Sequence, residues 1–203
     1  MIPPKHIKYS FKLDKYGLLN IDDRCRFSGI GFDEEHEIGE CSIALQIIPF
    51  CNGVIELGGG WGKVSHMINK ILSERDLQDR HLVFESSQEK VDDFLSKNKK
   101  LFGDRYSIAN KSASHINIDD LSIFDPYPDC LYVDCEGCLY DFQKTKLGRD
   151  LLQNSIKFIV NEMDGNNKLI KNQWSRYGFR MIARGYGCVD KCLTEVWYKE
   201  RNI

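Results

Sequence analysis

Four glycines crowd into five residues just after a short apolar run, and this feature constrains the fold more than any other. The segment 54–62 reads Val-Ile-Glu-Leu-Gly-Gly-Gly-Trp-Gly. It predicts a buried strand that ends near an acid, Glu56, followed by a tight turn and a helix. In an open α/β sheet such a turn lets a ligand approach the backbone, because glycine has no Cβ and tolerates positive φ. So many glycines are costly for folding alone, and we therefore expect a ligand there.

The spacing of these glycines excludes two common phosphate-binding patterns. A dinucleotide fingerprint would need its last glycine at position 63, where the chain has Lys63. A P-loop ending at Gly62 and Lys63 would have to begin at Leu57, and it would need a hydroxyl at the position of Val64. What remains is an acid at a strand tip followed by glycines at alternate positions.

That remaining pattern resembles the first motif of class I S-adenosylmethionine-dependent methyltransferases. The methionine part of this cofactor carries an ammonium and a sulfonium, which an acid at the strand end can hold directly or through water. The resemblance therefore implies cofactor binding by the acid and the turn that follows it, namely Glu56, Gly58, Gly60, Trp61 and Gly62.

Length and composition are those of one ordinary globular domain. The chain has 203 residues, of which 42% are hydrophobic, and a formal net charge of −2. We expect a single domain over 1–203, with a helical or irregular N-terminal cap at 1–50 and a catalytic core at 51–203. The near-neutral charge argues against a nucleic-acid partner, and no stretch is long and apolar enough to span a membrane.

The N-terminus lacks the apolar core of a signal peptide, so we expect a cytoplasmic protein whose eight cysteines are reduced thiols. A zinc site or a redox pair is the less favoured reading of the two closely spaced pairs, Cys135 with Cys138 and Cys188 with Cys192.

Strands and helices alternate from residue 52 onward. The predicted strands are 53–57, 81–85, 105–109, 130–134, 156–162, 179–185 and 193–199. The predicted helices are 61–73, 87–100, 137–153 and 167–177, and a further helix at 38–50 precedes the first strand. This order predicts an α/β fold with a Rossmann-like, mostly parallel seven-stranded sheet and helices on both faces. The last two strands have no helix between them, which predicts a C-terminal antiparallel hairpin, the class I methyltransferase layout.

Polar side chains follow the second and third predicted strands. Glu85 comes about twenty residues after the glycine turn, a position that suits a bidentate bond to a ribose diol, and Ser86 follows it. Asn110 and Ser112 end the third strand on the same side, where they could bond the adenine edge. Ordinary turn chemistry is an equal alternative for these two residues.

The fourth and fifth predicted strands carry a more specific signature. Segment 133–137 reads Val-Asp-Cys-Glu-Gly, and the strand 158–162 ends in Glu162. These pieces, with a later Tyr-Gly-Phe at 177–179, resemble the FkbM-type methyltransferase family over roughly residues 52–199. The chain departs from the family pattern at Glu56 and Trp61, where an aspartate and a nearby asparagine are usual, and at Leu139, where a second acid is usual.

Methyl transfer to an alcohol needs a general base or a metal, since an ordinary sugar hydroxyl is a weak acid. The candidate catalytic residues are Asp134, Glu136, Glu162 and His36. One route is a divalent metal, Mg or Mn, held by oxygen ligands at Asp134, Glu162 and Asp164. The other is a metal-free carboxylate or histidine base. Asp134 also counts among the cofactor-binding residues.

The favoured function is an S-adenosylmethionine-dependent O-methyltransferase that acts on a sugar, a glycan or a sugar-containing small molecule, as the family resemblance implies. One alternative is a nucleic-acid methyltransferase, because 125–128 reads Asp-Pro-Tyr-Pro. That segment precedes its strand, however, whereas a base-stacking box must follow it. The other alternative is a cofactor-binding accessory protein without catalysis. We leave a homodimer open.

Overall fold

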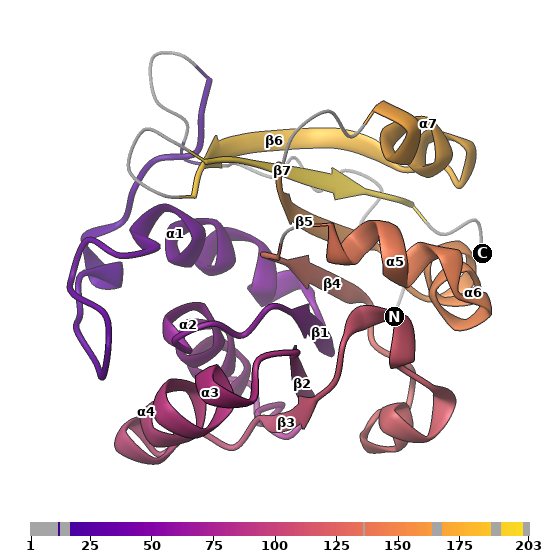
Figure 1. Cartoon of the computed structure of the whole chain (residues 1–203). Coiled ribbons are helices and arrows are strands. Elements are labelled where there is room, and N and C mark those ends of the chain that lie inside the picture. Colours follow the sequence, from indigo (N-terminus) through magenta and orange to yellow (C-terminus); the bar gives the residue numbers. More distant parts are fainter. Residues whose placement is uncertain (1–11, 13–16, 136, 164–167, 188–191, 201–203) are drawn as a thin grey trace.

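The centre of the molecule is a seven-stranded sheet (Figure 1). The computed structural model describes residues 12, 17–135, 137–163, 168–187 and 192–200. The strands are β1 (Val54–Leu57), β2 (His81–Glu85), β3 (Ser107–Asn110), β4 (Cys130–Val133), β5 (Phe158–Glu162), β6 (Arg180–Tyr186) and β7 (Leu193–Tyr198). Their order is β3-β2-β1-β4-β5-β7-β6. The first five pair in parallel, and β7 runs antiparallel to both β5 and β6. This confirms the predicted sheet and its terminal hairpin.

Helices cover both faces of this sheet. They are α1 (Ile38–Ile47), α2 (Lys63–Ser73), α3 (Gln88–Lys90), α4 (Ser96–Phe102), α5 (Cys138–Lys144), α6 (Lys146–Asn154) and α7 (Lys168–Arg176). A π-helical turn, Val91–Leu95, links α3 to α4. Short 3-10 turns lie at Asp23–Cys25, Ile48–Phe50, Ala113–His115 and Ile118–Ile123.

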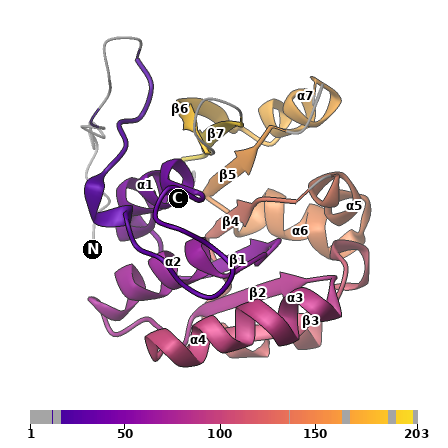
Figure 2. The same cartoon turned by 60° about the vertical axis from the view of Figure 1, so that its left-hand side comes forward.

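The core consists of two layers, one on each side of the sheet. On one side α1 and α2 bury side chains such as Ile43 and Ile68, and on the other α5, α6 and α7 bury Phe142, Leu152 and Trp174. Figures 1 and 2 show α1 and α2 on the side of the sheet away from α5 and α6. Because both faces are covered, every residue of β1, β2 and β4 is buried, which explains their continuous apolar runs.

Several helix boundaries differ from those predicted, and two of the differences have a clear local cause. The helix expected over 137–153 is two helices, because α5 ends at Lys144 and Thr145 begins a new one. The Thr145 hydroxyl accepts a hydrogen bond from the Gly148 amide at 2.9 Å and so caps the N-terminus of α6. The helix expected from residue 61 begins instead at Lys63, since Gly62 has a φ of +86°.

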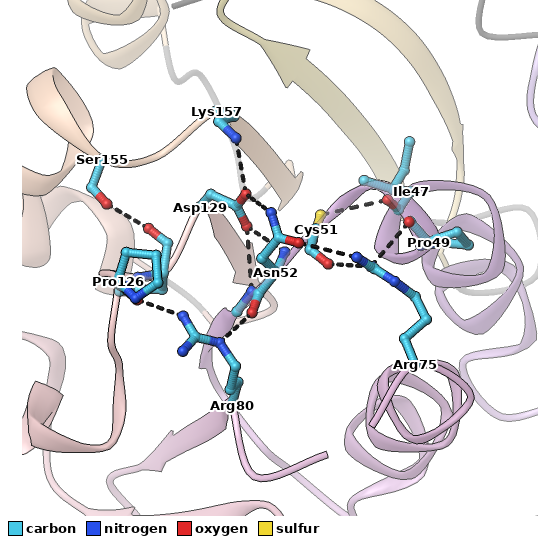
Figure 3. Close-up of polar contacts among 12 residues, drawn as sticks. Ile47, Pro49, Cys51, Asn52, Arg75, Arg80, Pro126, Asp129, Ser155 and Lys157 are labelled. Atoms are coloured by element: carbon cyan, nitrogen blue, oxygen red, sulfur yellow. Dashed lines mark hydrogen bonds and ion pairs between the residues drawn. The ribbon is translucent and has the colours of Figure 1, made fainter. Parts of the chain in front are cut away.

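A buried aspartate ties together the starts of three neighbouring strands (Figure 3). Asp129, just before β4, accepts hydrogen bonds from the Asn52 amide at 2.7 Å and from Lys157 Nζ at 3.2 Å, and these residues precede β1 and β5. Arg75 and Arg80 donate to backbone carbonyls of the adjoining loops. This network ties these strand starts together at the amino-terminal edge of the sheet.

Candidate functional site

A cavity of about 780 Å³ lies at the carboxyl ends of the parallel strands. Its walls come from the ends of β1, β2, β4 and β5 and from the segment before α1. Open α/β sheets bind their ligands at this edge. The cavity brings together these residues predicted from the sequence: His36, Gly58, Gly60, Trp61, Glu85, Ser86, Ser112, Asp134 and Glu162.

The glycine turn forms the floor of the cavity beside β1. Gly58, Gly60 and Gly62 have φ values of +91°, +49° and +86°, a region that favours glycine. A Cβ on Gly58 would fall 2.0 Å from the backbone oxygen of Asp134, so this glycine is required for β1 and β4 to approach. A Cβ on Gly60 would meet nothing closer than 3.9 Å and would project into the open cavity. Gly62 packs behind the turn and does not line the cavity.

Glu85 is fixed at the end of β2 by the turn itself. One carboxylate oxygen accepts a hydrogen bond from the Gly60 amide at 3.0 Å, and the other accepts one from the Ser87 amide at 2.8 Å. Asn110 does not face the cavity, because its Nδ2 donates to the Glu85 backbone oxygen at 2.9 Å and braces β2. Ser112 does line it, with its hydroxyl 2.9 Å from His115 Nδ1.

Glu56 lies outside the cavity, contrary to the sequence-based expectation. It is 1% exposed, and its oxygens lie 2.8 Å from the Ser65 hydroxyl and 2.8 Å from His81 Nε2. Glu56 lies within β1, not beyond its end, and its side chain points to the face that α2 covers. In this arrangement its carboxylate is satisfied inside the protein and offers no direct contact to a ligand.

Three other carboxylates converge at the end of β4. Glu37 and Glu40 come from the start of α1 and Asp134 from the residue after β4, and one oxygen of each lies within 4.8 Å of the others. Asp134 also interacts with the carboxyl groups of Glu162 and Glu40. Burial raises the pKa of Glu40 well above its usual range, and the negative charges of Asp134 and Glu37 add to the effect. Burial likewise raises the pKa of Asp134.

The segment that carries Glu37 is held in place by a buried lysine. Lys63, at the start of α2, donates from Nζ to the backbone oxygens of Glu34 at 2.7 Å and Asp33 at 3.2 Å. Its ammonium also lies 5.0 Å from the ring centre of Phe27. Burial lowers the pKa of Lys63. Lys63 therefore anchors 33–37 over the glycine turn.

His36 lies inside the cavity next to the acidic cluster. Its Nε2 is 3.0 Å from Glu37 Oε1, and its ring packs edge-on against Trp61 with 4.9 Å between centres. Interaction with Glu37 raises the pKa of His36. Lys90 in turn lies 5.1 Å from the centre of the Trp61 ring. Trp61 thus forms a flat, partly buried wall of the cavity.

Cysteines at the cavity wall are oxidised, and for these the expectation of reduced thiols is wrong. Cys135 and Cys138 form a disulfide across the turn between β4 and α5, with 5.7 Å between their Cα atoms. Cys192 is also disulfide-bonded. The buried thiols Cys25, Cys41, Cys51 and Cys130 are free. Three of these disulfide-bonded cysteines line the cavity.

The cavity is strongly acidic in the part of the chain that the structure describes. Its acids are Glu35, Glu37, Glu40, Glu85, Asp134, Asp141 and Glu162, against the lysines Lys90 and Lys111. Lys111 is already paired with Asp120 at 2.5 Å. Such a site favours a cationic or neutral ligand over a phosphate-rich one.

Sequence reasoning missed Glu37 and Glu40, although the acidic run at 33–37 and the start of a helix at residue 38 were both visible. Only the packing of α1 against β4 shows that these side chains reach Asp134. The Tyr132 hydroxyl makes this contact by donating to the Glu40 backbone oxygen at 2.9 Å. Two further predicted residues, Glu136 and Asp164, lie outside the described residues.

Comparisons with known proteins point to the methyltransferase fold. No family model matches the sequence, and no curated protein sequence matches it either. Among solved structures, a precorrin-6y C5,15-methyltransferase from Geobacter metallireducens GS-15 aligns with a TM-score of 0.59 at 15% identity over 89% of this chain and 97% of that one. M. capricolum TrmK, in complex with S-adenosyl-homocysteine, aligns with a TM-score of 0.59 at 9% identity over 80% of this chain and 68% of that one.

A third similar structure is the S-adenosyl-homocysteine-bound methyltransferase PaMTH1 of Podospora anserina, with a TM-score of 0.52 at 15% identity over 79% of this chain and 78% of that one. The shared feature is the Rossmann-like seven-stranded sheet with its terminal hairpin. At these identities the likeness establishes the fold. In the described residues, no helix has the length and apolar character needed to cross a membrane.

Proposed function

We propose that this protein is an S-adenosylmethionine-dependent methyltransferase that transfers a methyl group to a hydroxyl oxygen of a sugar, a glycan or a sugar-containing small molecule. The observation that carries the proposal is a single cavity at the carboxyl edge of a methyltransferase-like sheet. It combines a glycine turn, a buried acid at the end of β2 and carboxylates clustered beside the end of β4. The FkbM-type resemblance supports the sugar acceptor.

Cofactor binding follows from three features of the cavity. The open space above Gly60 admits the ligand close to the backbone. Glu85, held by two backbone amides, presents its carboxylate where a ribose diol would lie. The seven carboxylates of the cavity supply the negative potential that the cofactor's ammonium and sulfonium require.

The transfer itself is an in-line displacement in which the acceptor oxygen attacks the methyl carbon as the carbon–sulfur bond breaks. S-adenosylhomocysteine leaves as a neutral thioether, and the hydroxyl proton passes to a base. Asp134, whose raised pKa makes it a better base than an ordinary aspartate, is our candidate, with Glu162 or His36 beside it. Positioning supplies up to roughly 7–11 kcal/mol of the barrier reduction.

The acidity of the cavity supports a neutral polyol as acceptor. A nucleic-acid substrate would bring phosphates toward seven carboxylates and two lysines, which is electrostatically unfavourable. The Asp-Pro-Tyr-Pro segment at 125–128 lies before β4. It therefore sits at the opposite edge of the sheet from the cavity.

The first experiment is calorimetric titration of the purified protein with S-adenosylhomocysteine in EDTA. We expect micromolar binding that Gly60→Val abolishes, because the new side chain fills the cavity. The second is transfer of labelled methyl groups from S-adenosylmethionine to a panel of sugars, glycosides and RNA. Asp134→Asn should retain cofactor binding and lose transfer by roughly 10²–10⁴-fold.

Asp141→Asn serves as the control, since Asp141 lines the rim but pairs with Lys144. Absence of S-adenosylhomocysteine binding by the wild-type protein would reject the cofactor assignment. Methylation of RNA with no methylation of any hydroxyl compound would reject the acceptor class. Full activity of Asp134→Asn would show that another group is the base.

A further inference from the structure

We propose that Glu37, Glu40 and Asp134 form a binding site for a single divalent cation with a preference for oxygen ligands, such as Mg²⁺, Mn²⁺ or Ca²⁺, at the α1 side of the cavity. This site differs from the one predicted from the sequence, because two of its ligands come from α1. Its use in catalysis rests on the proposed function, but its existence does not.

The first argument is the spacing of the three carboxylates. One oxygen from each lies within 4.8 Å of the other two. Two oxygens on opposite sides of a Ca²⁺ ion lie about 4.6–5.2 Å apart, since each bond is 2.3–2.6 Å long. The three oxygens are therefore close enough to bind one ion together, and small side-chain adjustments would suit the shorter bonds of Mg²⁺.

The second argument is an unsatisfied oxygen on one of the three carboxylates. Glu40 is 1% exposed, and its Oε1 has no hydrogen-bond partner among the described residues. Glu40 nevertheless lines the cavity. A buried carboxylate oxygen without a partner is costly, and a bound cation is one of the few groups that can satisfy it.

The third argument is the shortage of positive charge. In the described parts of the chain, His36 is the one basic side chain within ion-pair distance of the three carboxylates, and it contacts Glu37 alone. Lys63 points to the backbone oxygens of Asp33 and Glu34 instead. Among the described residues, Glu40 and Asp134 thus have no basic side chain within ion-pair distance.

The three carboxylates are also carried by rigid parts of the fold. A Cβ on Gly39 would fall 1.7 Å from the backbone oxygen of Tyr186, so the start of α1 packs directly against β6. The Tyr132 hydroxyl fixes α1 to β4 at the level of Glu40. Such preorganisation is what a cation site with defined geometry requires.

The test is a titration of the full-length, metal-free protein with Mn²⁺, followed by electron paramagnetic resonance, with Mg²⁺ and Ca²⁺ as competitors. We expect one Mn²⁺ per chain and at least tenfold weaker binding in Glu40→Gln. Glu37→Gln should show a similar loss, and it guards against a folding defect that is specific to the buried position. Asp141→Asn, a carboxylate at the rim of the same cavity, should bind Mn²⁺ as the wild type does.

Thermal unfolding in EDTA checks that each variant is folded, and S-adenosylhomocysteine is titrated separately in EDTA. Binding of S-adenosylhomocysteine without binding of Mn²⁺ would overturn the cation site and leave the proposed function intact. Binding of Mn²⁺ without binding of S-adenosylhomocysteine would overturn the proposed function and leave the cation site intact. The proposal is wrong if Glu40→Gln binds Mn²⁺ as tightly as the wild type. If that variant also binds S-adenosylhomocysteine more weakly, the cluster serves the cofactor's ammonium instead.

Discussion

At the residue scale, Glu85 is the side chain whose role in cofactor binding can be tested most directly. Glu85→Gln removes the charge that a ribose diol would meet, and hydrogen bonds to charged groups contribute about 1.5–3 kcal/mol. We therefore expect the dissociation constant of S-adenosylhomocysteine to rise roughly 10- to 100-fold by calorimetry.

The matched control for this change is Glu89→Gln on the exposed side of α3. It should leave the dissociation constant unchanged. Because Glu85 also accepts from the Gly60 and Ser87 amides, the unfolding temperature of each variant must be measured as well. Equal affinity of wild type and Glu85→Gln would remove Glu85 from the cofactor site.

Asp22 gives a pH prediction of defined sign. Its side-chain hydrogen bond with Arg24 lowers the pKa of Asp22 from 3.8 to about 2. Because the pKa is lower in the folded state, the charged form of Asp22 stabilises the fold at pH values above the pKa of the unfolded state. This contribution disappears as the pH falls toward 2. Wild type should exceed Asp22→Asn in unfolding free energy near neutral pH, and the difference should shrink between about pH 4 and pH 2.

This difference is measured by urea unfolding at a series of pH values. We expect it to be small, because Arg24 is largely exposed and solvent weakens the pair. A difference that does not change across that pH range would contradict the assignment.

At the scale of single elements, Lys63 connects α2 to the segment that carries His36 and Glu37. Lys63→Met keeps most of the buried volume but removes the donor from the backbone oxygens of Asp33 and Glu34. A hydrogen bond that involves a charged group, as the Lys63 ammonium does here, contributes about 1.5–3 kcal/mol. We expect this loss in the free energy of unfolding, together with faster amide hydrogen exchange at 33–37.

Lys70→Met is the control, since Lys70 lies on the exposed side of the same helix. A surface change of this kind is usually within about 0.5 kcal/mol of wild type. If exchange at 33–37 is unaltered in Lys63→Met, the segment is held by its aromatic contacts and not by the ammonium.

The disulfide between Cys135 and Cys138 shows the limit of sequence reasoning at this scale. Their spacing was visible, but the same spacing is compatible with a free pair, a metal site or a bond. The turn after β4 decides among these, because it brings the two Cα atoms to 5.7 Å.

At the scale of the whole molecule, a bound cofactor should stabilise the fold. Binding to the folded state alone at one hundred times the dissociation constant contributes about 2.7 kcal/mol. For a chain of this size that corresponds to a rise in unfolding temperature of about 5–11 °C. Scanning calorimetry with and without S-adenosylhomocysteine measures it, and Gly60→Val should show no rise.

The arrangement of the sheet was predictable, whereas the composition of the site was predictable only in part. Alternating strands and helices predicted the parallel sheet, and the lack of a helix between the last two strands predicted the hairpin. Side chains that follow strand ends, such as Glu85 and Asp134, were placed correctly at one edge because parallel strands end together. Glu56 was not placed correctly. Successive side chains of a strand point to opposite faces of the sheet, and Glu56 points to the face that α2 covers.

By itself, the sequence determined the class of fold, the glycine turn and the carboxyl edge as the place for a ligand. These follow from periodicity and from the conformations that glycine alone adopts easily, which are local properties of the chain. The tertiary structure alone decided that Glu37 and Glu40 face Asp134, that Lys63 holds the segment above them and that Glu56 is paired internally. Contacts between residues far apart in the chain depend on how helices pack on the sheet, and no local pattern encodes that packing.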